Sequence, residues 1–124
     1  MQLSEPQQPP LPAPIEEFVS ALNSGNLEAL LATFAAHALV NDQLREYWGS
    51  KEIAEWARHD LTGQHLTLQV GKVTRNGDHT VIAARVDGDF EKRGLPDPLI
   101  VTFYFSVLDG KLVQLIILRN ETLA

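Results

Sequence analysis

The chain has 124 residues, of which 44% are hydrophobic, so it is long enough for one domain with a core and too apolar for wholesale disorder. Its net charge is −6 and its longest basic run is "KR" at positions 92 and 93, which excludes the dense positive charge that nucleic-acid binding requires. The absence of cysteine excludes disulfides, thiolate metal sites and a cysteine nucleophile.

Five of the prolines lie in the first 14 residues, a composition that favours an extended, solvated arm. This start lacks both the basic and the apolar region of a signal peptide, and no apolar run approaches the roughly 20 residues that span a bilayer. We therefore expect a cytoplasmic protein with no membrane association. The expected organisation is a disordered arm over residues 1–13, one domain over 14–120 and a short tail over 121–124.

Two short helices are predicted next. The first carries one apolar stripe, made of Ile15, Phe18, Val19 and Leu22. The sequence "NSGN" ends it, because Gly25 can adopt the left-handed cap and Asn26 can cap the following helix. That second helix places Leu27, Leu30, Leu31 and Phe34 on one face and is expected to end near His37.

The stretch "ALVNDQLREYW" predicts two short strands around a turn at "NDQ". Ser50 is a suitable N-cap for a third helix over residues 51–61, with Glu52 in its first turn. The apolar face of that helix contains Ile53, Trp56, Ala57 and Leu61, and Asp60 shares this face.

The rest of the chain predicts strands over residues 65–76, 79–90, 98–108 and 111–119, with tight turns at "RNGDH" and "LDGK". Helices followed by a meander indicate an α+β fold with the helices on one face of a curved antiparallel sheet. The strands "LIVTFYFSVL" and "VQLIIL" are apolar on both faces, which predicts a second cover. We expect that cover to be another copy of the chain, giving a homodimer through the sheet.

This order of elements resembles the nuclear-transport-factor-2-like superfamily, and in particular its SnoaL-like branch. "FVSALNSGNLEALLATFAAHALVND" is similar to the opening of bacterial ketosteroid isomerases, and "DGKLVQL" matches the turn and last strand of the branch. The resemblance covers about residues 14 to 119. It implies a cone of three N-terminal helices packed on a strongly curved, mixed or antiparallel sheet.

The same resemblance places Asp42 where the isomerases keep the carboxylate that moves the proton. An acid at the edge of an apolar pocket suits this role, because desolvation raises its pKa and makes the carboxylate a better base. The isomerases also use two hydrogen-bond donors for the enolate oxygen, and here those positions hold Phe18 and Phe103. A phenyl ring donates no hydrogen bond, so ketosteroid isomerase activity is not expected. The alternative for Asp42 is the start of a turn in open solvent.

Several other residues are candidates for contact with a ligand. We expect Asp42 to face a cavity bordered by Phe18, Val40, Trp56 and Phe103, with Asp60 as a second acid nearby. Tyr47 and Tyr104 are possible replacement donors, although exposed or interface positions are their alternative. The alternative for Trp56 is a plain core position. The four histidines occur at no ligand spacing, so no metal site is expected.

Together these observations predict a pocket protein for a small apolar ligand that is polyketide-, terpenoid- or steroid-like. If the protein is catalytic, we expect an isomerase, dehydratase or cyclase that transfers protons without a cofactor, with Asp42 as the base. The alternative is a non-catalytic ligand-binding or dimerisation module on the same fold.

Overall fold

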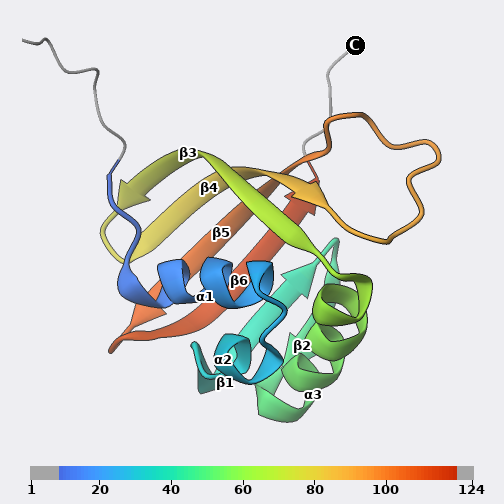
Figure 1. Ribbon diagram of the computed structural model, residues 1–124. Coiled ribbons are helices and arrows are strands. Elements are labelled where there is room, and N and C mark those ends of the chain that lie inside the picture. Colours follow the sequence, from blue (N-terminus) through green and yellow to red (C-terminus); the bar gives the residue numbers. More distant parts are fainter. Residues whose placement is uncertain (1–8, 120–124) are drawn as a thin grey trace, which may run out of the picture.

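The structure, a computed structural model, describes residues 9–119 (Figure 1). Its helices are α1 (Ala13–Asn23), α2 (Leu27–Leu31) and α3 (Gly49–Trp56), and α3 continues into a π-helical turn η1 (Ala57–Leu61) and a 3₁₀ turn η2 (Thr62–Gln64). The strands are β1 (Phe34–Asp42), β2 (Arg45–Trp48), β3 (Thr67–Asn76), β4 (His79–Asp87), β5 (Ile100–Leu108) and β6 (Lys111–Arg119). Most of the expected N-terminal arm and all of the expected tail lie outside the described residues.

The six strands form one sheet in the order β2-β1-β6-β5-β4-β3. All neighbours are antiparallel except β1 and β6, which run parallel. Figure 1 shows the sheet curving around the helices, which lie on its concave face, without closing into a barrel. This arrangement confirms the predicted α+β fold, with three helices on a curved, mixed sheet.

Several predicted boundaries were wrong, and one of them is the end of the strand predicted over 79–90, which lies at Asp87. The second helix ends at Leu31 and strand β1 already begins at Phe34, where a longer helix was expected. Pairing with β6 explains the difference, because Phe34 lies opposite Leu112 and the Leu112 N–H donates to the Thr33 carbonyl at 2.8 Å. These hydrogen bonds to a distant strand outweigh the local helical pattern of "LATFAAH".

The third helix also differs from its prediction. It starts at Gly49, and the backbone N–H of Trp48 donates to the Glu52 carboxylate at 2.8 Å, so Ser50 is not its N-cap. After Trp56 the helix widens into the π-helical turn, a local irregularity that is common at functional sites. Asp60 lies within this turn.

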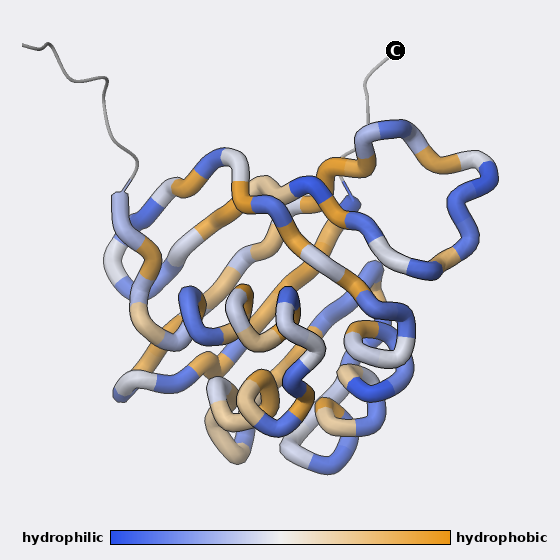
Figure 2. Tube along the Cα trace, in the orientation of Figure 1, coloured by the Kyte–Doolittle hydropathy of each residue, from blue (hydrophilic) through white to orange (hydrophobic). Residues whose placement is uncertain are grey.

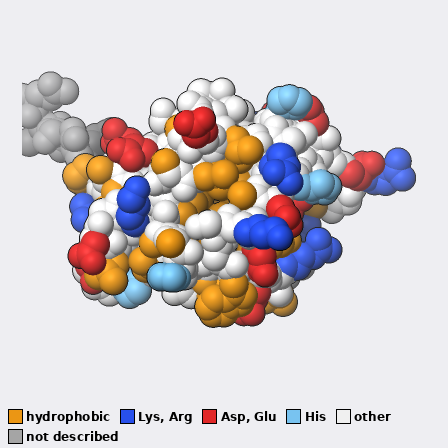
Figure 3. Space-filling model, turned by 90° about the horizontal axis from the view of Figure 1, so that it is seen from below, with side chains coloured by type: hydrophobic (Ala, Val, Ile, Leu, Met, Phe, Trp, Pro, Cys, Tyr) orange, Lys and Arg blue, Asp and Glu red, His pale blue; other side chains and the backbone are white. Residues whose placement is uncertain are grey.

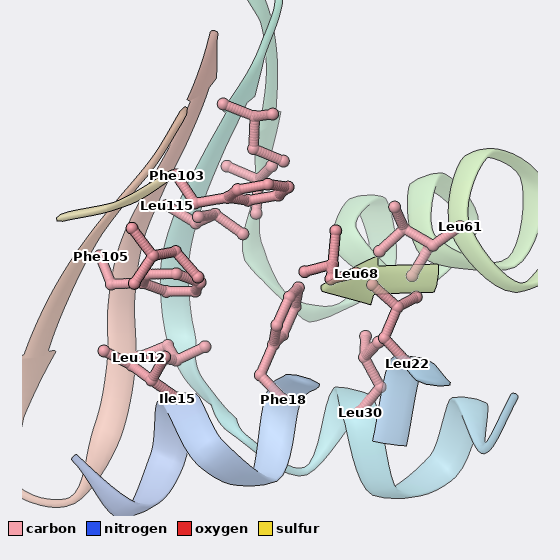
Figure 4. Packing of buried hydrophobic residues seen from close by; sticks show 14 of the residues in the cluster. Ile15, Phe18, Leu22, Leu30, Leu61, Leu68, Phe103, Phe105, Leu112 and Leu115 are labelled. Atoms are coloured by element: carbon pink, nitrogen blue, oxygen red, sulfur yellow. The ribbon is translucent and has the colours of Figure 1, made fainter. Parts of the chain in front are cut away.

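The core fills the space between the helices and the concave face of the sheet (Figure 4). Phe18 of α1 is fully buried and makes edge-to-face contacts with Phe34 and with Phe105, at centroid distances of 5.9 and 5.5 Å. Phe103 stacks beside Phe105 on β5, at 6.2 Å. The aromatic rings therefore tie the first helix to the middle of the sheet.

One side chain fastens α1 to the edge strand β3. Asn23, the last residue of α1, donates from Nδ2 to the Leu68 carbonyl at 2.9 Å and accepts from the Leu68 N–H at 2.7 Å. Both backbone groups of Leu68 are thereby satisfied by a single amide. The helix and the strand are 45 residues apart, so this contact closes the fold on that side.

We expect Asn23→Ala to destabilise the protein by about 2 kcal/mol, because it leaves two partly buried backbone groups of Leu68 without their partner. Urea denaturation measures the change. Gln69→Ala, which removes an exposed polar side chain from the same strand, is the control and should change stability by less than about 0.5 kcal/mol. Equal effects of the two substitutions would contradict this role for Asn23.

Candidate functional site

Asp42 is the last residue of β1, and the strand directs its side chain to the concave side of the sheet. Ala38 and Val40 precede it on the same face and are both fully buried. The turn that follows is capped by another residue, since the Asn41 side chain accepts the Leu44 N–H at 2.9 Å. Asp42 therefore does not cap this turn, which was the alternative interpretation of the residue from the sequence.

The indole of Trp56 holds the Asp42 carboxylate. Trp56 Nε1 donates to Asp42 Oδ2 at 2.9 Å, which joins the end of α3 to the end of β1. Trp56 is only 2% exposed, so its N–H requires a partner inside the protein. Tyr47 of β2 stacks on the indole at a centroid distance of 5.9 Å. The carboxylate therefore has a fixed orientation.

Burial raises the pKa of Asp42 above its ordinary value of 3.8. The hydrogen bond from Trp56 acts in the opposite direction and lowers this pKa, because it favours the charged carboxylate. The nearby negative charge of Asp60 raises the pKa further, and smaller effects of Gln43 and Arg45 lower it. The net result is a carboxyl group that ionises less readily than an exposed aspartate, which makes its carboxylate a stronger base.

A cavity of about 320 Å³ opens beside Asp42. Its walls are mostly apolar and come from the concave face of the sheet, the end of the third helix and the loop between β4 and β5. The lining residues are Asp42, Gln43, Asp60, Leu61, Gln64, Leu66, Val86, Phe90, Leu95, Leu99, Val101, Phe103, Ile117 and Arg119. An apolar hollow with a few converging polar groups is the usual form of a small-molecule site.

Asp60 is a second carboxylate at this cavity. Its side chain is 30% exposed, and its Oδ1 lies 2.6 Å from Nδ1 of His59, which is itself largely exposed. Asp42 and Asp60 reach the same hollow from different elements, one from a strand and one from the π-helical turn. Two carboxyl groups therefore meet at one cavity, and the charge of Asp60 contributes to the raised pKa of Asp42.

The structure distributes the other predicted contact residues differently. Phe103 lines the cavity together with Asp42 and Asp60. Phe18 and Val40 lie deeper in the core and are not part of the lining, because the cavity begins beyond the end of β1. Trp56 and Tyr47 stand behind Asp42, where they contact the acid or its partner.

Tyr104 lies on the opposite face of the sheet and is 40% exposed. Strand alternation separates it from its neighbours Phe103 and Phe105, which point inward. A ligand in the cavity therefore does not touch Tyr104, contrary to the expectation that it binds the ligand.

The loop between β4 and β5 contributes to the cavity, which was not predicted from the sequence. Phe90, Leu95 and Leu99 from this region line the cavity, as does Gln64 from η2. Figure 2 shows hydrophobic positions interrupting this otherwise hydrophilic loop. A phenylalanine within "DGDFEKRG" was the available signal, since an apolar ring in a polar loop usually covers something.

The described residues contain no group of three or more His, Asp or Glu side chains placed to hold a metal ion. In this part of the chain no helix has both the length and the apolar character required to cross a membrane. Figure 3 shows acidic and basic side chains interspersed on the face seen from below. The polar groups that line the cavity are carboxylates, amides and one guanidinium group.

We expect Asp42→Asn to remove a pH-dependent loss of stability. Because the folded-state pKa of Asp42 is raised, ionisation of this residue lowers the free energy of unfolding. The loss is absent below about pH 3.8 and grows as the pH rises through the folded-state pKa, to about 1.4 kcal/mol per unit of pKa difference. The variant should match the wild type in acid and be as stable or more stable at neutral pH. Urea denaturation across this pH range measures the difference.

Asp87→Asn is the matched control. The Lys92 contact, at 3.0 Å, and the Gly88 N–H lower the pKa of Asp87, so its stabilising effect is present at neutral pH and is lost as the pH falls. The two substitutions should therefore change stability in opposite directions as the pH rises. The same pH dependence in both variants would contradict the burial of Asp42.

Several solved structures are similar to this chain in fold. Among solved structures, a candidate polyketide cyclase from Sinorhizobium meliloti matches with a TM-score of 0.77 and 27% identity, covering 86% of this chain and 94% of its own. A candidate ketosteroid isomerase from Kribbella flavida matches with a TM-score of 0.74 and 14% identity, covering 91% and 79%. TerC, co-crystallised with polyporic acid, matches with a TM-score of 0.73 and 15% identity, covering 87% and 89%.

The last two likenesses are too distant in sequence to show more than the fold, which is the nuclear-transport-factor-2-like cone. No curated protein matches the chain. The family profile described as "SnoaL-like domain" matches residues 15–115, which is most of the chain and includes the strand that ends at Asp42. The chain belongs to the SnoaL-like domain family.

Proposed function

We propose that this protein binds a small, uncharged, mainly apolar molecule and transfers a proton on it, with Asp42 as the base. The observation that carries the proposal is the Asp42 carboxylate, oriented by Trp56 and opening into an apolar cavity. Burial makes this carboxylate a stronger base than an exposed aspartate. The reaction class is a cofactor-free isomerisation, dehydration or cyclisation of a polyketide-, terpenoid- or steroid-like compound.

Four polar residues at the cavity have a role in this scheme. Asp42 removes a proton from a carbon next to a carbonyl, and negative charge then develops on the carbonyl oxygen. Gln64 and Arg119 line the cavity and carry the donors that stabilise this oxygen. They donate the hydrogen bonds that the phenyl rings of Phe18 and Phe103 cannot donate. Asp42 then returns this proton to another position of the substrate, and the nearby negative charge of Asp60 favours the protonated form of Asp42 between the two steps.

The family relationship supports the same class of ligand. One similar structure is a candidate polyketide cyclase, and another was obtained with polyporic acid. Neither fixes the substrate of this chain, so the acid and the cavity remain the basis of the proposal. The rival is a binding module on the same fold that holds an apolar ligand and performs no reaction.

A neutral carbon acid tests the proposed base directly. In 5-nitrobenzisoxazole, removal of the C3 proton by a carboxylate breaks the N–O bond and releases a coloured cyanophenolate, with no other reagent. We expect Asp42→Asn to lower kcat/KM for this reaction by about 100-fold or more, the usual contribution of a positioned base. Absorbance assays over a range of pH measure the rate.

Trp56→Phe keeps the ring but removes the N–H that lowers the pKa of Asp42, so the rising limb of the pH–rate profile should move to higher pH. Trp48→Phe is the control, because that exposed indole only approaches Glu46, at 3.4 Å. An Asp42→Asn variant as fast as the wild type would refute the base. If the wild type binds 2-naphthol but does not accelerate the elimination, the binding-module alternative is the correct one.

We also propose that the protein is a homodimer that associates through the convex face of the sheet. Apolar side chains form a patch across three neighbouring strands there, made of Val81, Ala83, Tyr104, Ile116 and Leu118. Tyr104 is its centre, because it lies opposite Val81 on one side and Ile116 on the other. A second copy would cover this patch.

Introducing a charge at the patch tests the dimer. We expect Ile116→Lys to convert the protein to a monomer, because the ammonium group would be buried at the interface without a partner. Sedimentation velocity at micromolar concentration measures the mass. Leu44→Lys, at a residue that is 81% exposed outside the patch, is the control and should remain dimeric. A wild type that sediments as a monomer would rule out the proposed dimer.

A further inference from the structure

A second hollow lies beside the cavity of Asp42. It has a volume of about 330 Å³ and is bounded by the end of β4 and by the loop between β4 and β5. Figure 1 shows this loop extending beyond the sheet on the side where the third helix ends. We call this hollow the annex and define it by its four charged residues, Arg85, Asp87, Lys92 and Asp97.

The annex and the main cavity share a wall. Val86, Phe90, Leu95 and Leu99 line both hollows. Part of this wall is fixed by the sheet, since the Val86 N–H donates to the Leu99 carbonyl at 2.9 Å. The Phe90 and Leu95 side chains project from the loop instead and are only half-buried. They are the part of the wall that a change of rotamer can move.

The root of the loop is held firmly beside Phe90. The Asp89 N–H donates to the Gln64 carbonyl at 2.7 Å, and the Asp89 carboxylate lies 2.6 Å from Nδ1 of His65. Gly88 permits this close approach, because a Cβ at its position would lie 2.8 Å from the Gln64 oxygen. The backbone next to Phe90 is thus anchored, so a ligand can displace this half-buried ring only by a change of its rotamer.

The charges of the annex are balanced. Lys92 pairs with Asp87 at 3.0 Å, and its ammonium lies 5.5 Å from the centroid of the Phe90 ring. The other two charged residues of the annex are Arg85, which is positive, and Asp97, which is negative. Such a lining offers both donors and acceptors and no net charge, which suits a hydroxyl group better than an ion.

We propose that the two hollows form one bipartite site for an elongated neutral ligand, and that Phe90 determines whether the ligand can extend from the cavity into the annex. The apolar body of the ligand lies beside Asp42, and its hydroxylated end enters the annex. The inference rests on the proposed function, because it takes the cavity of Asp42 as the ligand site. With the ring turned aside, the volume open to a ligand is about doubled.

Three related probes test the proposal by fluorescence titration. They are 2-naphthol, 6-butyl-2-naphthol and 6-(4-hydroxybutyl)-2-naphthol, which share one ring system and differ in the length and the end of the chain. We expect the hydroxybutyl compound to bind about tenfold more tightly than 2-naphthol, because the annex buries its chain. It should also bind more tightly than the butyl compound, whose end forms no hydrogen bond.

Substitutions at Phe90 test the role of the shared wall independently of ligand binding in the main cavity. Phe90→Trp should remove the advantage of the hydroxybutyl compound while changing 2-naphthol affinity by less than about twofold, and Phe90→Leu should increase that advantage. Phe34→Ala is the control, since Phe34 is another half-buried phenylalanine, packed on Phe18 away from both hollows. Near-ultraviolet circular dichroism verifies that each variant is folded.

The outcomes distinguish the inference from the function on which it rests. If 2-naphthol binds but the longer compounds bind no better in the wild type or in Phe90→Leu, the bipartite site is refuted and the cavity remains. Equal effects of Phe90→Trp on all three probes would also refute it. If no naphthol binds, the proposed ligand class fails and the bipartite site fails with it.

Discussion

The hydrogen bond from Trp56 to Asp42 is the interaction on which the site depends. A buried indole N–H requires an acceptor, and a carboxylate at an apolar cavity requires a donor, so each group satisfies the need of the other. The bond also connects the end of the third helix to the end of β1, the strand against which this helix packs. Packing of Tyr47 on the indole extends the support to β2. The acid is thereby oriented by groups that a ligand does not touch.

Much of the fold was predictable because local patterns and long-range pairing agree. The strand β6 was predicted with its observed boundaries, since the turn "LDGK" marks its start and the apolar stretch "LVQLIIL" before Arg119 marks its extent. The predictions from local patterns were wrong where pairing with a distant strand determines the structure. Residues from Phe34 onward carry a helical pattern, yet they pair with β6 at the far end of the chain. No window of local sequence contains that partner.

The site was predictable only in part for the same reason. The resemblance of the N-terminal half pointed to Asp42, and the apolar face of the predicted third helix pointed to Asp60. The cavity wall comes from segments that are brought together only in three dimensions. Phe90 and Gln64 belong to a loop and a 3₁₀ turn, where no periodicity indicates which way a side chain points.

The parallel pairing of β1 and β6 affects how the site comes into existence during synthesis. Asp42 lies opposite Ile117, and the side chain of Gln43 donates to the Ile117 carbonyl at 3.2 Å, across a separation of 74 residues. A nascent chain that has passed Trp56 therefore contains both the acid and its donor, yet it still lacks the strand that fixes the end of β1. Contacts this distant in sequence close late and slow the folding of small domains. The acid, although it precedes β6 by about 70 residues, becomes a site only after β6 has been made.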